Sequence, residues 1–403
     1  MLGLLSNFMY KRKHYSILLS RLKEKRHFIQ VIMGPRQVGK STMVKQVLAD
    51  TDVPNIRFTA DNVPATNTGW ISNCWSSARA KMKIEGLDEL VLVIDEIQKI
   101  IGWSEVVKKE WDDDTFNDVN LKVVILGSSR VMLDKGLADS LAGRFERIIM
   151  SHWNYSEIRD AFGWDIDKFI YYGAYPGAAD LVDTSERWQE YITASIIDST
   201  INKDILIDTP IHKPALLRQT FELASFYSSQ ELSLTKLLGQ MTDAGNTTTV
   251  TGYLNVLGEA GLVTGLYKYT VDEARKRNST PKFQVYNNAL KAVYCSKNFQ
   301  EAYADRKLWG RIYESAIGAH ILSHAYEGEY RVFYWRDGDN EVDYVLEKKS
   351  KLIAIEVKSN DEVANKGLTL FQELFHPYMS FVVGDGGVKA EEFLCGNPAD
   401  LFK

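Results

Sequence analysis

Residues 34–42 combine glycine, lysine and hydroxyl side chains at a spacing that suits the binding of phosphate groups. The segment Gly34-Pro-Arg-Gln-Val-Gly-Lys-Ser41 satisfies the pattern G-x-x-x-x-G-K-[ST]. In such a loop the glycines let backbone N–H groups converge on phosphate oxygens, the lysine reaches the β- and γ-phosphates, and the serine hydroxyl ligates Mg²⁺. The sequence therefore predicts a site for ATP and Mg²⁺ formed by Gly34, Pro35, Arg36, Gln37, Val38, Gly39, Lys40, Ser41 and Thr42.

Two adjacent carboxylates follow the apolar run Leu90–Ile94. We expect Asp95 to hold the Mg²⁺ shell together with Ser41, and Glu96 to polarise the attacking water as a general base. An exposed pair of acids is the alternative interpretation, but such pairs seldom follow five residues of buried type. Lys40 and Glu96 are thus the main predicted catalytic residues.

Two further groups are candidates for the same site. The apolar run Leu121–Leu126 is followed by Gly127-Ser-Ser-Arg130, where Ser128 or Ser129 would orient the water or sense the γ-phosphate. An ordinary polar turn explains these serines equally well. Downstream, Arg144 supplies a guanidinium suited to a γ-phosphate, or to the nucleotide of a neighbouring subunit in a homo-oligomer. A surface arginine is the alternative there.

A second constellation lies near the carboxyl terminus. Glu314 falls in a helical stretch, Asp343 in an otherwise apolar strand pattern, and Ile353-Ala-Ile-Glu-Val-Lys358 contributes Glu356 and Lys358. This is the arrangement of the PD-(D/E)xK nucleases, in which the acids hold Mg²⁺ and the lysine stabilises charge on the attacked phosphate. The period of a strand puts Glu356 and Lys358 on one side. Alternating charges on a solvated sheet face are the competing interpretation.

The first half of the chain must position the phosphate-binding loop. Apolar runs at 28–33, 90–94 and 121–126 indicate buried strands, and helical stretches at about 42–49, 70–82 and 103–112 lie between them. Strands alternating with helices predict a mainly parallel sheet covered on both faces. A basic amphipathic helix at about 15–25 leads into the first strand.

The rest of the chain changes pattern. Mostly helical sequence extends to residue 208, and residues 215–269 give three helices and a strand, the pattern of a winged helix. Its third helix begins at the polar Asn246-Thr-Thr-Thr249, and Arg275, Lys276 and Arg277 lie near the expected wing tip, where such modules contact DNA or RNA. A helix at 307–326 and strands at 330–335, 341–347 and 352–358 indicate a separate α/β unit.

Composition bounds these interpretations. The 403 residues are 45% hydrophobic and 25% charged, which is typical of a soluble globular protein of two or three domains. A net charge of −5 excludes a uniformly basic nucleic-acid binder but leaves room for a local basic face. Three separated cysteines fit a reducing cytosol, and no apolar run approaches the roughly 18 residues of a membrane span. We expect a cytoplasmic protein without membrane contact.

The ordered set GPRQVGKST, VLVIDEIQKI, a strand ending in GSS, SLAGRFERI and YGAYPGAA resembles the prokaryotic AAA-type ATPases (AAA_14) that carry a DUF4143 carboxyl-terminal region. The resemblance covers nearly the whole chain. It implies an AAA-like P-loop ATPase core at 1–150, a helical lid at 151–212, a winged helix at 213–280 and a restriction-nuclease-like α/β domain at 281–403. The chain departs from the family pattern at two places. Arg130 replaces a small polar residue, and Asn287-Asn288 replaces a common aspartate, which weakens the case for an acid role there.

Three functions fit these patterns. The first is an ATPase that couples ATP binding and hydrolysis to action on nucleic acid, which the basic amino-terminal and wing segments favour. The second is a nucleotide-dependent switch that controls a protein partner, with an inert nuclease-like adaptor. The third is an ATP-gated, Mg²⁺-dependent nuclease.

Overall fold

The computed structural model describes residues 10–128, 136–137, 140–206, 210–242, 245–272, 279–359, 366–384 and 386–403. The chain divides into two compact units, Met1–Met150 and Ser151–Lys403, and each is described by itself. Five residues considered above lie outside the described ranges: Ser129, Arg130, Arg275, Lys276 and Arg277.

The first unit is built on a five-stranded parallel sheet with the P-loop-like order β2-β3-β4-β1-β5. The prediction of a mainly parallel α/β sheet is therefore confirmed. In chain order the elements are α1 (Lys13–Lys23), β1 (Ile29–Met33), α2 (Lys40–Ala49), β2 (Asn55–Thr59), α3 (Gly69–Glu85), β3 (Leu90–Asp95), the 3₁₀ turn η1 (Ile97–Lys99), α4 (Trp103–Phe116), β4 (Leu121–Gly127) and β5 (Phe145–Ile149).

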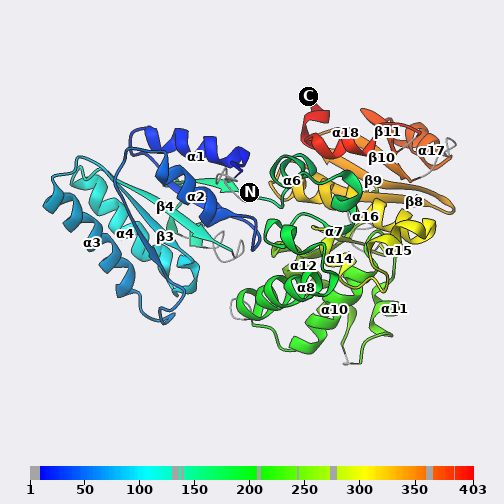
Figure 1. Ribbon diagram of the computed structural model, residues 1–403, viewed down its shortest axis with the longest axis horizontal. Helices are drawn as coiled ribbons and strands as arrows, with labels where there is room; N and C mark the ends of the chain where they lie inside the picture. Colours follow the sequence, from blue (N-terminus) through cyan, green and yellow to red (C-terminus); the bar gives the residue numbers. More distant parts are fainter. Residues whose placement is uncertain are drawn as a thin grey trace, which may run out of the picture. The chain divides into compact units, whose positions relative to one another are not determined.

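Helices cover both faces of this sheet (Figure 1). Along β3, Leu90, Leu92 and Ile94 pack in one core with α3 and α4. The alternate residues Val91 and Val93 pack in a second core with α1 and α2. Because successive side chains of a strand point to opposite faces, a strand buried on both sides must be apolar throughout. Burial on both faces thus explains why residues 90–94 are all apolar.

The two outer strands, β2 and β5, have no counterpart among the three strands expected from sequence. Their side chains are mostly exposed or half-buried. An edge strand is shielded less than a central one, so it carries charged residues such as Arg57 and Glu146 and lacks a continuous apolar run.

The second unit begins with helical segments that pack in a large core around Trp188 and several isoleucines. They are α6 (Tyr155–Phe162), α7 (Ile166–Tyr172), the 3₁₀ helix η2 (Pro176–Leu181), α8 (Ser185–Glu190) and the π-helical stretches η3 (Tyr191–Asp198) and η4 (Thr200–Ile205). Three helices and an antiparallel pair of strands follow: α10 (Pro214–Phe226), α11 (Leu234–Leu238), α12 (Thr247–Glu259), β6 (Val263–Leu266) and β7 (Lys282–Val285).

A mixed sheet of order β11-β10-β9-β8 forms the carboxyl-terminal part of the second unit. Helix α16 contacts β7, β8 and β10, whereas α17 contacts β9, β10 and β11. The elements of this part are α14 (Ala289–Ala292), α15 (Phe299–Ala304), α16 (Arg306–Ala325), β8 (Arg331–Asp337), β9 (Asn340–Lys348), β10 (Lys351–Lys358), α17 (Lys366–Phe375), β11 (Met379–Gly384), α18 (Ala390–Cys395) and η5 (Pro398–Phe402).

Across the described ranges of the chain, none of the helices combines the length and the apolar character needed to cross a bilayer.

Candidate nucleotide-binding site

The loop from Gly34 to Gly39 connects the end of β1 to the start of α2. Gly39 has φ 92° and Gly34 has φ 156°, conformations that side-chain-bearing residues rarely adopt. A Cβ atom on Gly34 would lie 2.0 Å from the carbonyl oxygen of Met150, so only glycine fits there. Gln37 also has a positive φ, at 61°. The glycine spacing of the motif thus has a steric cause in this chain.

The Lys40 side chain is buried and folds back over its own loop. Its ammonium donates to the carbonyl oxygens of Gly34 (2.8 Å) and Pro35 (2.7 Å). Ser41 and Thr42 follow it in the first turn of α2. Arg12, which precedes α1 and was not expected at this site, donates to the carbonyl oxygen of Val38 (3.2 Å) and so braces the loop. The Lys40 ammonium is thus held against the loop by two carbonyl oxygens. The phosphate oxygens of a nucleotide would replace these carbonyl oxygens as its acceptors.

Asp95 ends β3 beside the first turn of α2. Its Oδ2 accepts a hydrogen bond from the Ser41 hydroxyl (3.1 Å), so the two predicted Mg²⁺ ligands lie together. The same oxygen accepts from Nη2 of Arg57 on β2, at 2.6 Å. Sequence reasoning missed Arg57 because β2 itself was not expected. Half of the Arg57 side chain is exposed (50%), so water is accessible to this arginine beside Asp95.

Glu96 follows β3 with φ 57°, a left-handed conformation that non-glycine residues seldom adopt. Its Oε2 accepts from the Ser128 hydroxyl at the end of β4 (3.1 Å) and from Nε2 of Gln98 (2.7 Å). Ser128 and Glu96 therefore meet at the carboxyl edge of the sheet. Two donors orient the carboxylate, and strained backbone of this kind is common where an active-site group is positioned.

Arg144 does not join this group. It immediately precedes β5, and its carbonyl oxygen accepts from the N–H of Ile29 at the start of β1. The five residues of β1 separate that edge from the phosphate loop, roughly 16 Å at about 3.3 Å per residue. Its guanidinium makes two hydrogen bonds to Asp112 on α4, at 2.7 and 3.0 Å. The geometry gives Arg144 no role at the nucleotide of its own chain.

The carboxyl-terminal residues do come together, with an additional lysine. The Oδ2 of Asp343 accepts from the N–H of Val357 (2.9 Å), and the Lys358 ammonium lies 3.0 Å from Oε1 of Glu356. Lys282, the first residue of β7, lies 2.6 Å from Oε1 of Glu314 and 3.0 Å from Oδ1 of Asp343. We call these five residues (Lys282, Glu314, Asp343, Glu356 and Lys358) the carboxylate–lysine cluster.

Burial governs the protonation of this cluster. It raises the pKa of Glu314 to about 8, with the charge of Asp343 adding to the rise and Lys282 opposing it. It likewise raises the pKa of Glu356 to about 7. For Lys282, burial acts to lower the pKa, but the attraction of Asp343 and Glu314 outweighs it and holds the pKa well above the ordinary value. Burial and the charge of Asp343 thus favour the protonated form of Glu314, and the Lys282 ammonium favours its ionised form.

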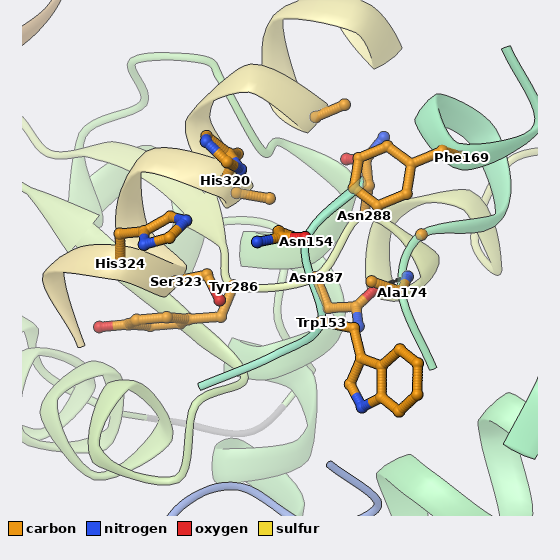
Figure 2. A pocket seen from close by; sticks show the side chains of 13 residues that line it. Trp153, Asn154, Phe169, Ala174, Tyr286, Asn287, Asn288, His320, Ser323 and His324 are labelled. Atoms are coloured by element: carbon orange, nitrogen blue, oxygen red, sulfur yellow. Dashed lines mark hydrogen bonds between the residues drawn. The ribbon is translucent and has the colours of Figure 1, made fainter. Parts of the chain in front are cut away.

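A separate pocket in the second unit collects aromatic, histidine and asparagine side chains, among them His320 and His324 of α16 (Figure 2). Its volume of about 20 Å³ accommodates one water and no larger ligand. Asn287 binds the backbone here: its Oδ1 accepts from the N–H groups of Ala174 (3.0 Å) and Ala289 (3.2 Å). This residue therefore joins the YGAYPGAA segment to β7 and serves as a structural link.

Comparisons with known proteins divide the chain into three matched regions. Residues 26–159 match the family described as an AAA domain. Residues 163–300 and 309–391 match two domains of unknown function, DUF8612 and DUF4143. The uncharacterized protein MJ1544 of Methanocaldococcus jannaschii is 22% identical over 353 residues, which cover 80% of this chain and 73% of the relative. The AAA match spans the phosphate loop, both carboxylates and Ser128, and it supports nucleotide binding by the first unit.

Proposed function

We propose that the first unit binds ATP with Mg²⁺ and hydrolyses it. The observation that supports this most is the meeting of Ser41 and Asp95 at 3.1 Å, beside a glutamate that Ser128 and Gln98 orient. Lys40 and the loop N–H groups bind the phosphates, and Ser41 and Asp95 hold the metal ion directly or through water. Glu96 accepts a proton from the attacking water, which Ser128 helps to orient.

The proposal is tested by measuring ATP turnover and the affinity for a fluorescent ATP analogue in the same preparations. Lys40→Ala is expected to weaken nucleotide binding by at least tenfold, because the phosphates lose their main cationic contact. Lys45→Ala, on the same helix, is the matched control and should leave the affinity unchanged within about twofold. Equal affinity of the Lys40 variant and the wild type would contradict the assignment of the loop.

For the output of this ATPase we propose action on nucleic acid, with α10–β7 as a winged helix and the carboxyl-terminal sheet as a PD-(D/E)xK-like domain. Support comes from the order of the helices and of the β6–β7 pair, and from the exposed Thr247 and Thr248 at the start of α12. Asn246 itself is used as the helix cap, since its Oδ1 accepts from the N–H of Thr249 (2.8 Å).

Duplex DNA, single-stranded DNA and RNA should each be added to the turnover assay at low and high salt. Stimulation that falls with rising salt is expected for a protein that contacts phosphates. Equal turnover with and without all three nucleic acids, together with no binding at low salt, would leave the proposal without support.

The second candidate is a nucleotide-dependent switch for a protein partner. One observation favours it: Lys282 already occupies the centre of the carboxylate–lysine cluster, which suits an inert adaptor better than a metal-dependent nuclease. It predicts nucleotide-dependent association with a partner or with a second copy of this chain, without any effect of nucleic acid on turnover. Sedimentation with ATP, with ADP and without nucleotide measures the self-association.

A further inference from the structure

Lys282 contacts three oxygens of the carboxylate–lysine cluster. Its ammonium donates to Oδ1 of Asp343 (3.0 Å) and to the carbonyl oxygen of Asp343 (3.4 Å). It also forms an ion pair with Oε1 of Glu314 at 2.6 Å. The ring of Tyr344 lies near it as well, 4.9 Å from the nitrogen to the ring centre. The nitrogen is thus held by oxygens from a helix and a strand, in the way a bound metal ion is held.

The charges of the cluster also compare Lys282 with a metal ion. The three carboxylates of the cluster carry three negative charges when ionised, and Lys358 offsets one of them. A divalent cation would offset the other two. Lys282 already offsets one of them. A divalent ion placed between Glu314 and Asp343 would therefore lie next to the Lys282 ammonium, and two cations in the same place repel each other.

The Lys282 side chain is buried, and the strand that carries it is fixed. The Lys282 side chain is 7% exposed, in contrast to the half-exposed Arg57 beside Asp95. Its backbone is fixed between neighbours: the N–H of Leu232 donates to the carbonyl oxygen of Pro281 (3.2 Å), and the N–H of Phe283 to that of Gln230 (3.1 Å). Phe283 is fully buried in the core. The strand that carries Lys282 is therefore fixed, and the side chain itself is shielded from water.

We infer that Lys282 is the built-in cation of this cluster and occupies the position of a divalent metal ion, so that the chain binds no such ion there. The inference goes beyond the proposed ATPase and does not depend on it. The cluster thereby has a structural role, because the ammonium joins β7 to α16 and β9 through ion pairs. Mg²⁺-dependent cleavage of phosphodiesters at these residues is excluded on this assignment.

The inference is tested by measuring the binding of Mn²⁺ to the full chain without nucleotide, with electron paramagnetic resonance as the readout. Asp343→Asn keeps an oxygen that accepts from the N–H of Val357 but removes a carboxylate. The difference in bound Mn²⁺ between a protein with and without this change therefore measures the Mn²⁺ bound at the cluster. The wild type and its Asp343→Asn variant are expected to bind equal amounts. Lys282→Ala should gain one Mn²⁺ that Asp343→Asn then removes, whereas Lys282→Arg, which keeps the cation, should gain none.

Loss of a bound Mn²⁺ when Asp343→Asn is introduced into the wild type would overturn the inference. So would a folded Lys282→Ala chain that gains no Mn²⁺, since the ammonium would then not stand in a metal position. Should Lys282→Ala fail to fold, the comparison of the wild type with Asp343→Asn still decides the first point. ATP turnover of the same samples separates this outcome from failure of the proposed ATPase, because Lys282 belongs to the second unit.

Discussion

Glu96→Gln is the sharpest test of the hydrolytic site. The change removes a proton acceptor while keeping the volume and the length of the side chain. Ser128 donates to Oε2 of Glu96 at 3.1 Å and Gln98 donates at 2.7 Å, and the carbonyl oxygen of glutamine can accept both bonds. The local structure is therefore expected to survive, at a cost of about 1 kcal/mol or less in the free energy of unfolding.

The loss of turnover should be much larger than the loss of stability. A positioned general base contributes roughly 10²–10⁴ in rate, which corresponds to about 2.7–5.4 kcal/mol in the activation barrier. Phosphate binding is assigned to the Lys40 ammonium and the loop, where Lys40 donates to the carbonyl oxygens of Gly34 and Pro35, and the change leaves both in place. Affinity for ATP is expected to stay within about threefold of the wild type, so kcat falls while binding persists.

The assay combines single-turnover hydrolysis of radiolabelled ATP with equilibrium binding of the same nucleotide. Glu85→Gln, a surface acid at the end of α3, is the matched control because it removes the same charge from the same unit. A Glu96→Gln variant that hydrolyses ATP within tenfold of the wild type would refute the assignment of Glu96 as the base. Equal loss of binding and of turnover would refute the division of labour between Glu96 and the loop.

Three further predictions follow from the contacts described. Gly34→Ala is expected to destabilise the first unit by about 2–3 kcal/mol or more, because a Cβ meets a backbone oxygen at 2.0 Å; Gly86→Ala, also at positive φ but in open space, should cost only about 1–2 kcal/mol in thermal unfolding. The free energy of unfolding of the second unit should fall as pH rises from about 5 to 8, since Glu314 has a pKa of about 8 when folded against an ordinary value of 4.5. Between the two pKa values the native state keeps a proton that the unfolded chain releases. Glu314→Gln should therefore reduce the pH dependence of the free energy of unfolding measured by urea titration. An unchanged pH dependence in this variant would contradict the prediction. Arg144→Ala should leave turnover of the monomer within about twofold; a loss above a hundredfold in concentrated samples would instead show that Arg144 acts on a neighbouring copy.

Central strands and the phosphate loop were predictable because their residues satisfy two constraints at once. Leu90–Ile94 is apolar on both faces, and the carboxylates that follow must therefore lie at the sheet edge. The loop glycines are fixed by backbone conformation, which leaves a local signature. The carboxyl ends of parallel strands lie at the same edge of the sheet, so Ser41, Asp95, Glu96 and Ser128 were all expected there. Which of them meet depends on the strand order.

The contacts that could not be predicted from the sequence depend on which distant segments lie side by side in the fold. Arg57 is invisible as a partner of Asp95 until β2 is known to lie beside β3. In the sequence Lys282 looks like the last residue of a polar stretch, and its burial becomes visible only when β7 is seen to lie in the core. The position of Arg144 along the chain likewise does not say which edge of the sheet it occupies.

The fit of Gly34 against Met150 has a mechanical consequence. Met150 donates its N–H to the carbonyl oxygen of Met33 (2.8 Å), and its own carbonyl oxygen fills the space where Gly34 would carry a side chain. The next residue, Ser151, begins the second unit. The loop and the last residue of the first unit are thus packed without a gap. A displacement of Gly34 toward Met150 therefore has to move the Met150 peptide as well.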